Sequence, residues 1–191
     1  MSVTPIETEI KLRISSLEDA KARIEARGFR VARERVFESN TIYDTSGGRL
    51  RAAGELLRLR QVGAGGLMTF KGRGEAGRHK ARPEVETELN DPAAAAKILE
   101  AVGFRPVFRY EKYRTEFDRS DSEGSVVLDE TPIGAFMELE GDPHWIDSVA
   151  AELGFTESEY LTASYGKLYT DYCRAANKTP GDMVFSDAGN G

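Results

Sequence analysis

The sequence predicts an α+β protein built on an antiparallel sheet or barrel. Most of the chain alternates apolar and polar residues with a period of two, which is typical of strands that bury one face. Only a few segments have the composition of helices, and most of these end at a glycine. The chain has 191 residues, is 40% hydrophobic and shows no linker, so we expect one domain over residues 1–176.

The first half of the chain is predicted to be mainly extended. A helix is expected at 16–28, with Ser16 as its N-cap and Gly28 just past its end. Gly47 and Gly48 mark a turn before a short extended piece, and a glycine-rich turn later closes a hairpin. The strands are expected at residues 5–14, 30–38, 41–45, 56–62 and 67–71.

The second half continues the same pattern with more helices. A basic, glycine-bearing loop is expected at 72–80, and a polar tail at 177–191 is expected to be disordered or peripheral. Asp91 and Pro92 form a helix-start signal. Strands are expected at residues 82–90, 105–118, 125–130 and 134–140, and helices at residues 93–102, 143–153 and 162–176.

The composition favours a cytoplasmic protein that acts on neither nucleic acid nor membranes. With 26 basic and 32 acidic residues the net charge is −6, whereas nucleic-acid binders are more often basic. The single cysteine, Cys173, argues against a disulfide-rich secreted fold. No signal-peptide pattern and no apolar run of membrane-spanning length is evident. His79 and His144 lie far apart in the sequence, which argues against a histidine zinc site.

Charged residues recur at every second position of the predicted strands. A solvated face of an antiparallel sheet explains any one such strand. Here nearly every strand carries two or more full charges. If the sheet closes, they face an interior where buried charge must be neutralised by water, metal and anion. These charges are Glu7, Glu9, Lys11, Arg13, Arg58, Arg60, Lys71, Arg73, Arg82, Glu84, Glu86, Glu88, Lys112, Arg114, Asp129, Glu138 and Glu140.

The residue types on this face indicate a metal-bound polyphosphate as the ligand. Glu and Asp without His or Cys select hard cations such as Mg²⁺ or Mn²⁺. Arginine pairs bind phosphate oxygens in a bidentate way, and lysine adds a point charge. The sequence has no Gly-x-x-x-x-Gly-Lys-Ser/Thr motif, so it is not a P-loop protein.

Several of these segments resemble one known family. Glu7-Thr8-Glu9-Ile10-Lys11 resembles the ExExK signature of the CYTH superfamily, also called the triphosphate tunnel metalloenzymes. ExExK alone is a weak motif, but further segments follow in the family's order over roughly residues 5–172. They are Tyr43-Asp44-Thr45, Leu57-Arg58-Leu59-Arg60, Thr69-Phe70-Lys71-Gly72, Arg82-Pro83-Glu84-Val85-Glu86, Glu111-Lys112-Tyr113-Arg114, Val127-Leu128-Asp129, Phe136-Met137-Glu138-Leu139-Glu140-Gly141 and Ser164-Tyr165.

The resemblance implies a closed eight-stranded antiparallel tunnel with helices packed outside, and it assigns roles to the charges. Lys11 and Tyr43 would help to activate the attacking water, although core packing explains Tyr43 equally well. The metal would be held near Glu7, Glu9, Asp129, Glu138 and Glu140, with Glu84 and Glu86 as further contributors. The triphosphate would be bound by Lys11, Arg58, Arg60, Lys71, Arg82, Lys112 and Arg114.

The resemblance also limits the function. Family members hydrolyse inorganic triphosphate, thiamine triphosphate or nucleoside triphosphates, and others are class IV adenylyl cyclases. We therefore expect a metal-dependent triphosphatase acting on tripolyphosphate. A class IV adenylyl cyclase that converts ATP to cyclic AMP and pyrophosphate is the first alternative, and a non-catalytic sensor of polyphosphate or nucleotide is the second. The oligomeric state is open and includes a homodimer.

Overall fold

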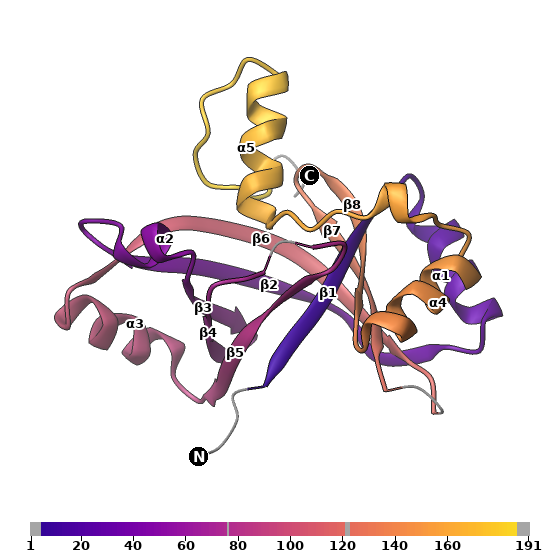
Figure 1. The fold of residues 1–191 in the computed structure, drawn as a ribbon. Helices are drawn as coiled ribbons and strands as arrows, with labels where there is room; N and C mark the ends of the chain where they lie inside the picture. Colours follow the sequence, from indigo (N-terminus) through magenta and orange to yellow (C-terminus); the bar gives the residue numbers. More distant parts are fainter. Residues whose placement is uncertain (1–4, 76, 121–122, 187–191) are drawn as a thin grey trace.

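The computed structural model describes residues 5–75, 77–120 and 123–186 (Figure 1). The strands are β1 (Ile6–Ile14), β2 (Arg30–Thr45), β3 (Leu56–Val62), β4 (Gly65–Lys71), β5 (Lys80–Leu89), β6 (Phe104–Asp118), β7 (Ser125–Thr131) and β8 (Gly134–Glu140). Within the described residues these eight strands form a closed antiparallel barrel in the order β1-β5-β4-β3-β2-β6-β7-β8. The predicted α+β barrel is therefore confirmed.

The helices in the described ranges pack around this barrel. They are α1 (Leu17–Ala26), α2 (Arg49–Ala53), α3 (Pro92–Ala101), α4 (Pro143–Glu152) and α5 (Tyr165–Ala175), with a 3₁₀ turn η1 (Glu157–Glu159). Figure 1 shows α1 and α4 together on one side, α3 on the opposite side and α5 standing above the barrel. None of these helices combines the length and the apolar composition needed to cross a bilayer.

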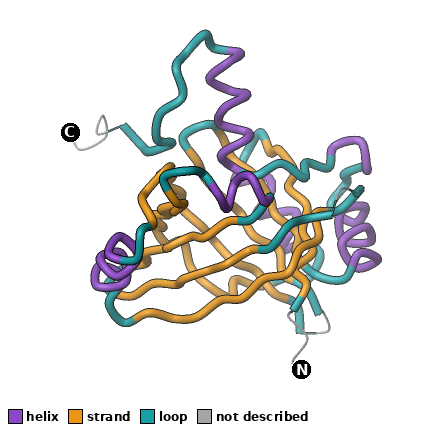
Figure 2. The backbone as a smooth tube through the Cα atoms, turned by 60° about the vertical axis from the view of Figure 1, so that its left-hand side comes forward, coloured by secondary structure: helices purple, strands orange, loops and turns teal. Residues whose placement is uncertain are grey.

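Apolar residues on the outer barrel face anchor the helices. The largest cluster lies beneath α1 and α4, where Ile24 and Ile146 pack against Leu12 and Leu139. A second cluster joins Leu99 of α3 to the outer face of β3. Figure 2 shows the strands enclosing the centre of the molecule, with helices outside them. On the strands that the helices cover, alternation turns one face outward to the apolar clusters and leaves the other face for the barrel interior.

The longest strands, β2 and β6, form one continuous pair. Their register runs from Arg30 opposite Asp118 to Thr45 opposite Phe104, with irregularities on the way. The sequence analysis expected two separate strands here, at 30–38 and 41–45, with a break that includes Asn40. Asn40 is buried, and its Oδ1 accepts a hydrogen bond from Arg60 Nε at 3.2 Å, so the polar side chain has a partner inside the barrel.

The predicted extended piece after Gly48 is wrong, because this segment forms the short helix α2. The carboxylate of Asp44 accepts hydrogen bonds from the backbone nitrogens of Leu50 at 2.9 Å and Arg51 at 3.0 Å. Gly48 adopts the left-handed conformation, φ 68°, immediately before the helix. A buried acid thus satisfies the helix amides, although it lies several residues upstream of the usual capping position.

The chain after α5 returns to the barrel. Met183 is 1% exposed; its nitrogen donates to Arg109 O at 2.9 Å, and its carbonyl accepts from Glu111 N at 2.9 Å. The ring of Phe185 then packs against Tyr113. This ordered packing of residues 177–186 differs from the disordered or peripheral tail expected from the sequence. The remainder of the expected tail, residues 187–191, lies outside the described residues.

Candidate active site: a charged tunnel

The strand alternation places most of the predicted charged residues inside the barrel. Arg13, Arg73 and Glu88, which were expected on the same face, are instead exposed and do not line the cavity. On β3, Leu57 and Leu59 pack outward under α3, so Arg58 and Arg60 point inward. The interior holds a cavity of about 940 Å³. Its wall includes all the residues predicted to bind phosphate, and it includes the predicted metal ligands apart from Asp129.

Part of the wall is cationic, on the strands that flank β2. The guanidinium of Arg58 donates to Thr69 Oγ1 at 3.1 Å and to Tyr110 Oη at 3.4 Å. Arg60 donates to an uncharged amide, that of Asn40. Since these hydrogen-bond partners are neutral, they orient the arginine side chains without cancelling their charge. Glu86, which accepts from Thr69 Oγ1 at 2.6 Å, is an exposed carboxylate 3.5 Å from Arg58.

Asp129 organises the neighbouring cations on β6. Its carboxylate accepts hydrogen bonds from Lys112 Nζ at 2.8 Å and from Arg114 at 2.8 and 2.7 Å. Tyr165 at the start of α5 donates to the same carboxylate at 2.7 Å. Burial raises the pKa of the Tyr165 hydroxyl, and the charge of Asp129 raises it further, so this hydroxyl stays protonated and continues to donate. The structure thus places Asp129 behind the cationic wall, whereas the sequence grouped it with the metal-binding carboxylates.

The opposite wall is rich in carboxylates from β1, β5 and β8. Lys71 Nζ lies 2.6 Å from Glu7 Oε2 and 2.8 Å from Glu84, which bind it between them. Arg82, also predicted to bind phosphate, lies 3.7 Å from Glu7. Glu140 comes from β8, where its Cα is paired with that of Glu9 on β1. These acids therefore converge on one end of the cavity.

Glu9 connects two lysines in the same wall. Its carboxylate accepts from Lys11 Nζ at 3.0 Å and from Lys80 Nζ at 2.6 Å. Glu138 lies 3.2 Å from Lys11 and also accepts a hydrogen bond from Arg114, which links the two walls. Burial opposes ionisation of Glu9, but Lys11 and Lys80 hold its pKa well below the usual range.

Lys11 is held in its charged form by this arrangement. Burial would lower its pKa, yet the charges of Glu138 and Glu9 outweigh burial and raise it. The opposite holds for Lys80, where burial dominates and lowers the pKa to about 8 despite the neighbouring Glu9. Lys11 therefore acts as a fixed cation, and Lys80 is the lysine closer to losing its proton at neutral pH.

The donor set and electrostatics of the acidic wall fit a hard divalent cation. Burial and a hydrogen bond with Glu7 raise the pKa of Glu84 to about 7. Burial and the charge of Glu7 likewise raise the pKa of Glu140 to about 7. The raised pKa values mean that the charge of Lys71 does not offset the cost of burying these two carboxylates, so a bound cation would stabilise their ionised form. Oxygen-only donors match Mg²⁺ or Mn²⁺. Among the described residues, no group of three or more acids, histidines or cysteines is arranged to hold a metal ion. Several of the carboxylates are bound to lysines instead, as Glu7 is to Lys71 and Glu9 is to Lys80.

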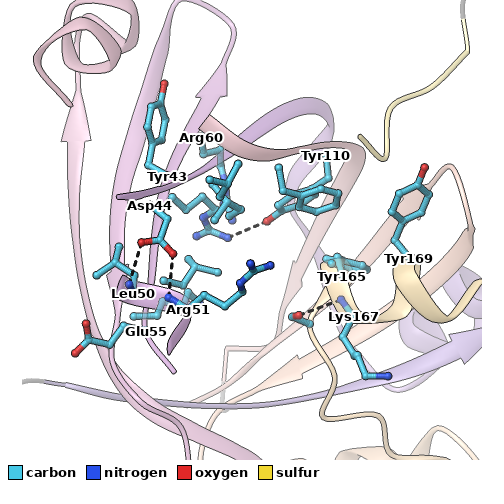
Figure 3. Close-up of a pocket in the computed structure, with 18 of the residues that line it drawn as sticks. Tyr43, Asp44, Leu50, Arg51, Glu55, Arg60, Tyr110, Tyr165, Lys167 and Tyr169 are labelled. Atoms are coloured by element: carbon cyan, nitrogen blue, oxygen red, sulfur yellow. Dashed lines mark hydrogen bonds between the residues drawn. The ribbon is translucent and has the colours of Figure 1, made fainter. Parts of the chain in front are cut away.

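Tyr43 is among the residues that line the cavity, but its ring is turned toward the outer apolar cluster. Its ring packs in this cluster with Leu57 and Leu99, and burial, with the charge of Glu100 of α3, raises the pKa of its hydroxyl. In Figure 3 the ring points away from Tyr165 and Lys167 on the other side of the pocket. The predicted pair of Lys11 and Tyr43 is therefore not brought together, and the packing matches the alternative explanation for Tyr43.

Sequence reasoning missed several residues of the tunnel. Glu38 is fully buried beside Arg60 and Lys112, and Tyr110 lies against Arg58. Burial opposes ionisation of Tyr110, but Arg58 and its neighbours lower the pKa of the hydroxyl. The sequence did contain a pattern that could have identified Glu38, since Glu38 and Asn40 are two residues apart and share a strand face. The predicted break between residues 38 and 41 interrupted this pattern.

One end of the cavity adds aromatic and apolar side chains to its lining. Along the inner face of β6, charge gives way to Tyr110 and then Phe108, whose ring stacks on Tyr110 at 5.9 Å and on Tyr169 of α5 at 6.0 Å between centroids. Ile42 and Leu56 continue this lining on β2 and β3. Figure 3 shows Tyr110 and Tyr169 across the pocket from Asp44 and the start of α2. The tunnel thus joins a charged interior to an aromatic mouth.

The basic loop before β5 is tied to the outside of the barrel. Arg78 lies 2.5 Å from Asp147 of α4 and 2.5 Å from Glu157 of η1. His79 Nε2 lies 2.8 Å from the second oxygen of Asp147. These contacts hold the loop in place where its end, Lys80, enters the tunnel.

In this barrel a cationic wall faces a carboxylate wall across one cavity. Such a site is suited to a polyanion, and its carboxylate oxygens are suited to a hard metal ion. The family model of the CYTH domain matches residues 5–165. The chain belongs to the CYTH domain family.

Individual relatives agree with this assignment. A Methanocaldococcus jannaschii protein named "putative adenylate cyclase" is 27% identical over 135 residues, covering 71% of this chain and 76% of that protein. The Vibrio parahaemolyticus structure of a "putative adenylate cyclase" has a TM-score of 0.77 at 22% identity, covering 88% and 99% of the two chains. A Hippeastrum protein, a "putative adenylyl cyclase" with "a dominant" triphosphatase activity, has a TM-score of 0.64 at 19% identity, covering 91% and 97%. At these identities the two structures establish the fold alone.

Proposed function

We propose that this protein is a divalent-metal-dependent phosphohydrolase that cleaves inorganic tripolyphosphate to pyrophosphate and phosphate inside the tunnel. The observation that carries this proposal is the opposition of the cationic wall and the carboxylate wall across one cavity. A linear triphosphate presents charged oxygens along its whole length, so it can occupy both walls through cations and bound metal. The triphosphatase activity of the Hippeastrum protein supports the same choice.

The cationic wall would bind the phosphate chain. The planar guanidinium groups of Arg58 and Arg60 can each donate two hydrogen bonds to phosphoryl oxygens, and neutral partners fix their orientation. Lys112 and Arg114 are fixed by Asp129 before any ligand arrives. Such pre-organised charge stabilises a transition state without reorganisation at the moment of reaction.

The carboxylate wall would hold Mg²⁺ or Mn²⁺. A metal held there would supply positive charge that offsets the negative charge of the phosphoryl oxygens. The lysines that pair with these acids in the free protein would then have phosphoryl oxygens as alternative partners. The carboxylates that fit this role are Glu7, Glu9, Glu84, Glu138 and Glu140.

Protons near the reacting phosphorus would be handled by the lysines of β1 and β5. Lys11, held in its charged form, would orient a phosphoryl oxygen or the attacking water as a cation. Lys80, whose pKa is about 8, can exchange a proton near neutral pH. In this proposal Tyr43 stays a packing residue, and Tyr110 accepts a hydrogen bond from Arg58 of the cationic wall.

Product analysis of the purified protein tests the proposal. We expect tripolyphosphate with Mg²⁺ or Mn²⁺ to yield phosphate and pyrophosphate faster than ATP is consumed, and excess chelator to stop the reaction. Arg58→Lys keeps the charge but loses the fork, so kcat/KM should fall about a hundredfold. The melting temperature without ligand should change little. The exposed Arg105→Lys, on β6, is the matched control; unchanged turnover in Arg58→Lys would contradict the proposal.

The aromatic mouth favours a second candidate, a class IV adenylyl cyclase. Ile42, Phe108 and Tyr169 offer apolar contacts that an inorganic triphosphate does not need. In that reaction the ribose 3′-hydroxyl attacks the α-phosphorus of ATP and pyrophosphate leaves. Cyclic AMP and pyrophosphate as the main products, with tripolyphosphate acting only as an inhibitor, would establish this alternative. Tight binding of either compound without turnover would instead indicate a sensor.

A further inference from the structure

Glu38 of β2 is a negative charge placed among the cations that face the cavity. It is 0% exposed. Its Oε1 lies 3.3 Å from Arg60 Nη1, and its Oε2 lies 3.6 Å from Lys112 Nζ. Arg60 and Lys112 line the cavity, whereas Glu38 lies behind them and does not. A phosphoryl group bound to these two cations would therefore also feel the charge of Glu38.

Glu38 is ionised even though it is fully enclosed. Burial opposes ionisation, but Lys112 and Arg60 hold the pKa of the carboxyl at about 2, with further help from Arg114 and Arg58. Its charge is thus permanent at any physiological pH. It cancels part of the positive charge that the tunnel offers to an anion.

Glu38 differs from Asp129, the other fully buried acid beside Lys112. Asp129 accepts hydrogen bonds from Lys112, Arg114 and Tyr165, so it fixes side-chain geometry. Neither oxygen of Glu38 has a hydrogen-bond partner among the described residues. Arg60 is instead oriented through its Nε by Asn40. Glu38 therefore acts on the cations through charge more than through geometry.

We propose that Glu38 is a resident counter-anion that limits how tightly the tunnel binds polyphosphate, so that the product can leave after cleavage. The inference rests on the proposed function, because it concerns the affinity of the same site. Without Glu38, Arg60 and Lys112 would direct more of their positive charge to the ligand, and both substrate and product would bind more tightly. Glu38 is thus an affinity-setting residue rather than a catalytic one.

Calorimetric binding of tripolyphosphate and pyrophosphate in chelator, without a divalent metal, tests this inference. Glu38→Gln keeps the shape and removes the charge, so we expect both ligands to bind on the order of tenfold more tightly. Glu38→Asp keeps the charge and should stay near the wild-type affinity. Asn40→Asp adds a charge at the next inward position of β2, beside Arg60, and should weaken binding by a similar factor.

Turnover gives an independent readout. If product release limits the rate, Glu38→Gln should lower both KM and kcat, a pattern that a lost structural contact would not produce. Equal or weaker binding by folded Glu38→Gln would overturn the inference. If Glu38→Gln does not fold, the Asn40→Asp variant tests the inference in its place. An unchanged affinity of that variant for the two ligands would contradict the inference. Absence of polyphosphate binding by the wild-type protein would instead reject the proposed function itself.

Discussion

At the scale of single residues, the partners of a buried charge decide what it does. Asp129 and Glu138 both contact Arg114, but Asp129 is surrounded by donors, whereas Glu138 faces Lys11 at the cavity wall. The same side-chain type therefore serves once as a support for cations and once as a lining group. Sequence alternation predicts that these acids point inward, but it does not distinguish a lining position from one behind it.

We expect Asp129→Asn to lower the free energy of unfolding by about 3–5 kcal/mol, because it removes the carboxylate that is hydrogen-bonded to both buried cations, Lys112 and Arg114. Denaturant unfolding measures the loss. Activity should fall as well, since both cations lose the group that aims them at the ligand.

The next residue on β7 provides the control for this prediction. Glu130 forms an exposed ion pair with Arg35, so Glu130→Gln should cost less than about 1 kcal/mol. Equal effects of the two substitutions would show that Asp129 is not the main anchor of Lys112 and Arg114.

The residues of the site were predictable to different degrees. Arg58, Arg60, Lys71 and Glu9 follow from strand parity alone, because each is flanked by residues of the opposite face. Tyr43 could not be assigned from sequence, since its face depends on where α2 and α3 pack.

At the scale of elements, the C-terminal segment completes one wall of the tunnel. Pro180 and Gly181 line the cavity, and Met183 continues from them into a cluster with Tyr110 and Phe136. The sequence suggested a tail because the segment is polar and short of apolar residues. Its position depends on a single buried methionine and on backbone hydrogen bonds to β6, which local composition does not reveal.

We expect Met183→Ala to destabilise the protein by about 2–5 kcal/mol, through lost burial and the cavity left behind. Thermal unfolding measures this effect, and amide exchange at residues 109–111 should increase because Met183 bonds to that stretch. Val184→Ala is a suitable comparison, since Val184 is 36% exposed. Near-wild-type stability of Met183→Ala would show that the segment is not an integral part of the fold.

The strand and helix pattern was largely predictable, whereas the exceptions depend on tertiary contacts. The predicted helices near α1, α3 and α4 were found because caps and terminal glycines mark them locally. The helix α2 was missed because its capping acid, Asp44, belongs to the preceding strand. Closure of the eight-stranded barrel was implied by the family resemblance, since alternation alone allows an open sheet, and the order of the strands was not predicted.

At the scale of the whole molecule, the tunnel makes stability depend on pH in two opposite ways. Glu38 and Glu9 have lowered pKa values, so their contribution is lost as the pH falls below the usual carboxyl range. Glu84 and Glu140 have pKa values raised to about 7, so the folded state binds more protons than the unfolded state above pH 4.5. Their contribution is therefore lost as the pH rises toward 7.

We expect the metal-free protein to become less stable between pH 5 and pH 7.5, and Glu84→Gln to remove part of this decline. Denaturant unfolding at a series of pH values, in chelator, measures the slope. Glu88→Gln, an exposed change on the same strand, should leave the slope unaltered. An identical slope in Glu84→Gln and wild type would rule out Glu84 as a source of the decline.

Closure of the barrel also determines when the molecule is vulnerable. β1 pairs with β5 on one side and with β8 on the other, and β8 begins more than a hundred residues after β1 ends. At a synthesis rate of about 5–20 residues per second, the ribosome needs on the order of ten seconds to supply that last partner. Until then the nascent chain exposes an unpaired strand edge, the feature that promotes association between chains. Aggregation is therefore a hazard of biosynthesis for this protein, and the finished barrel removes it.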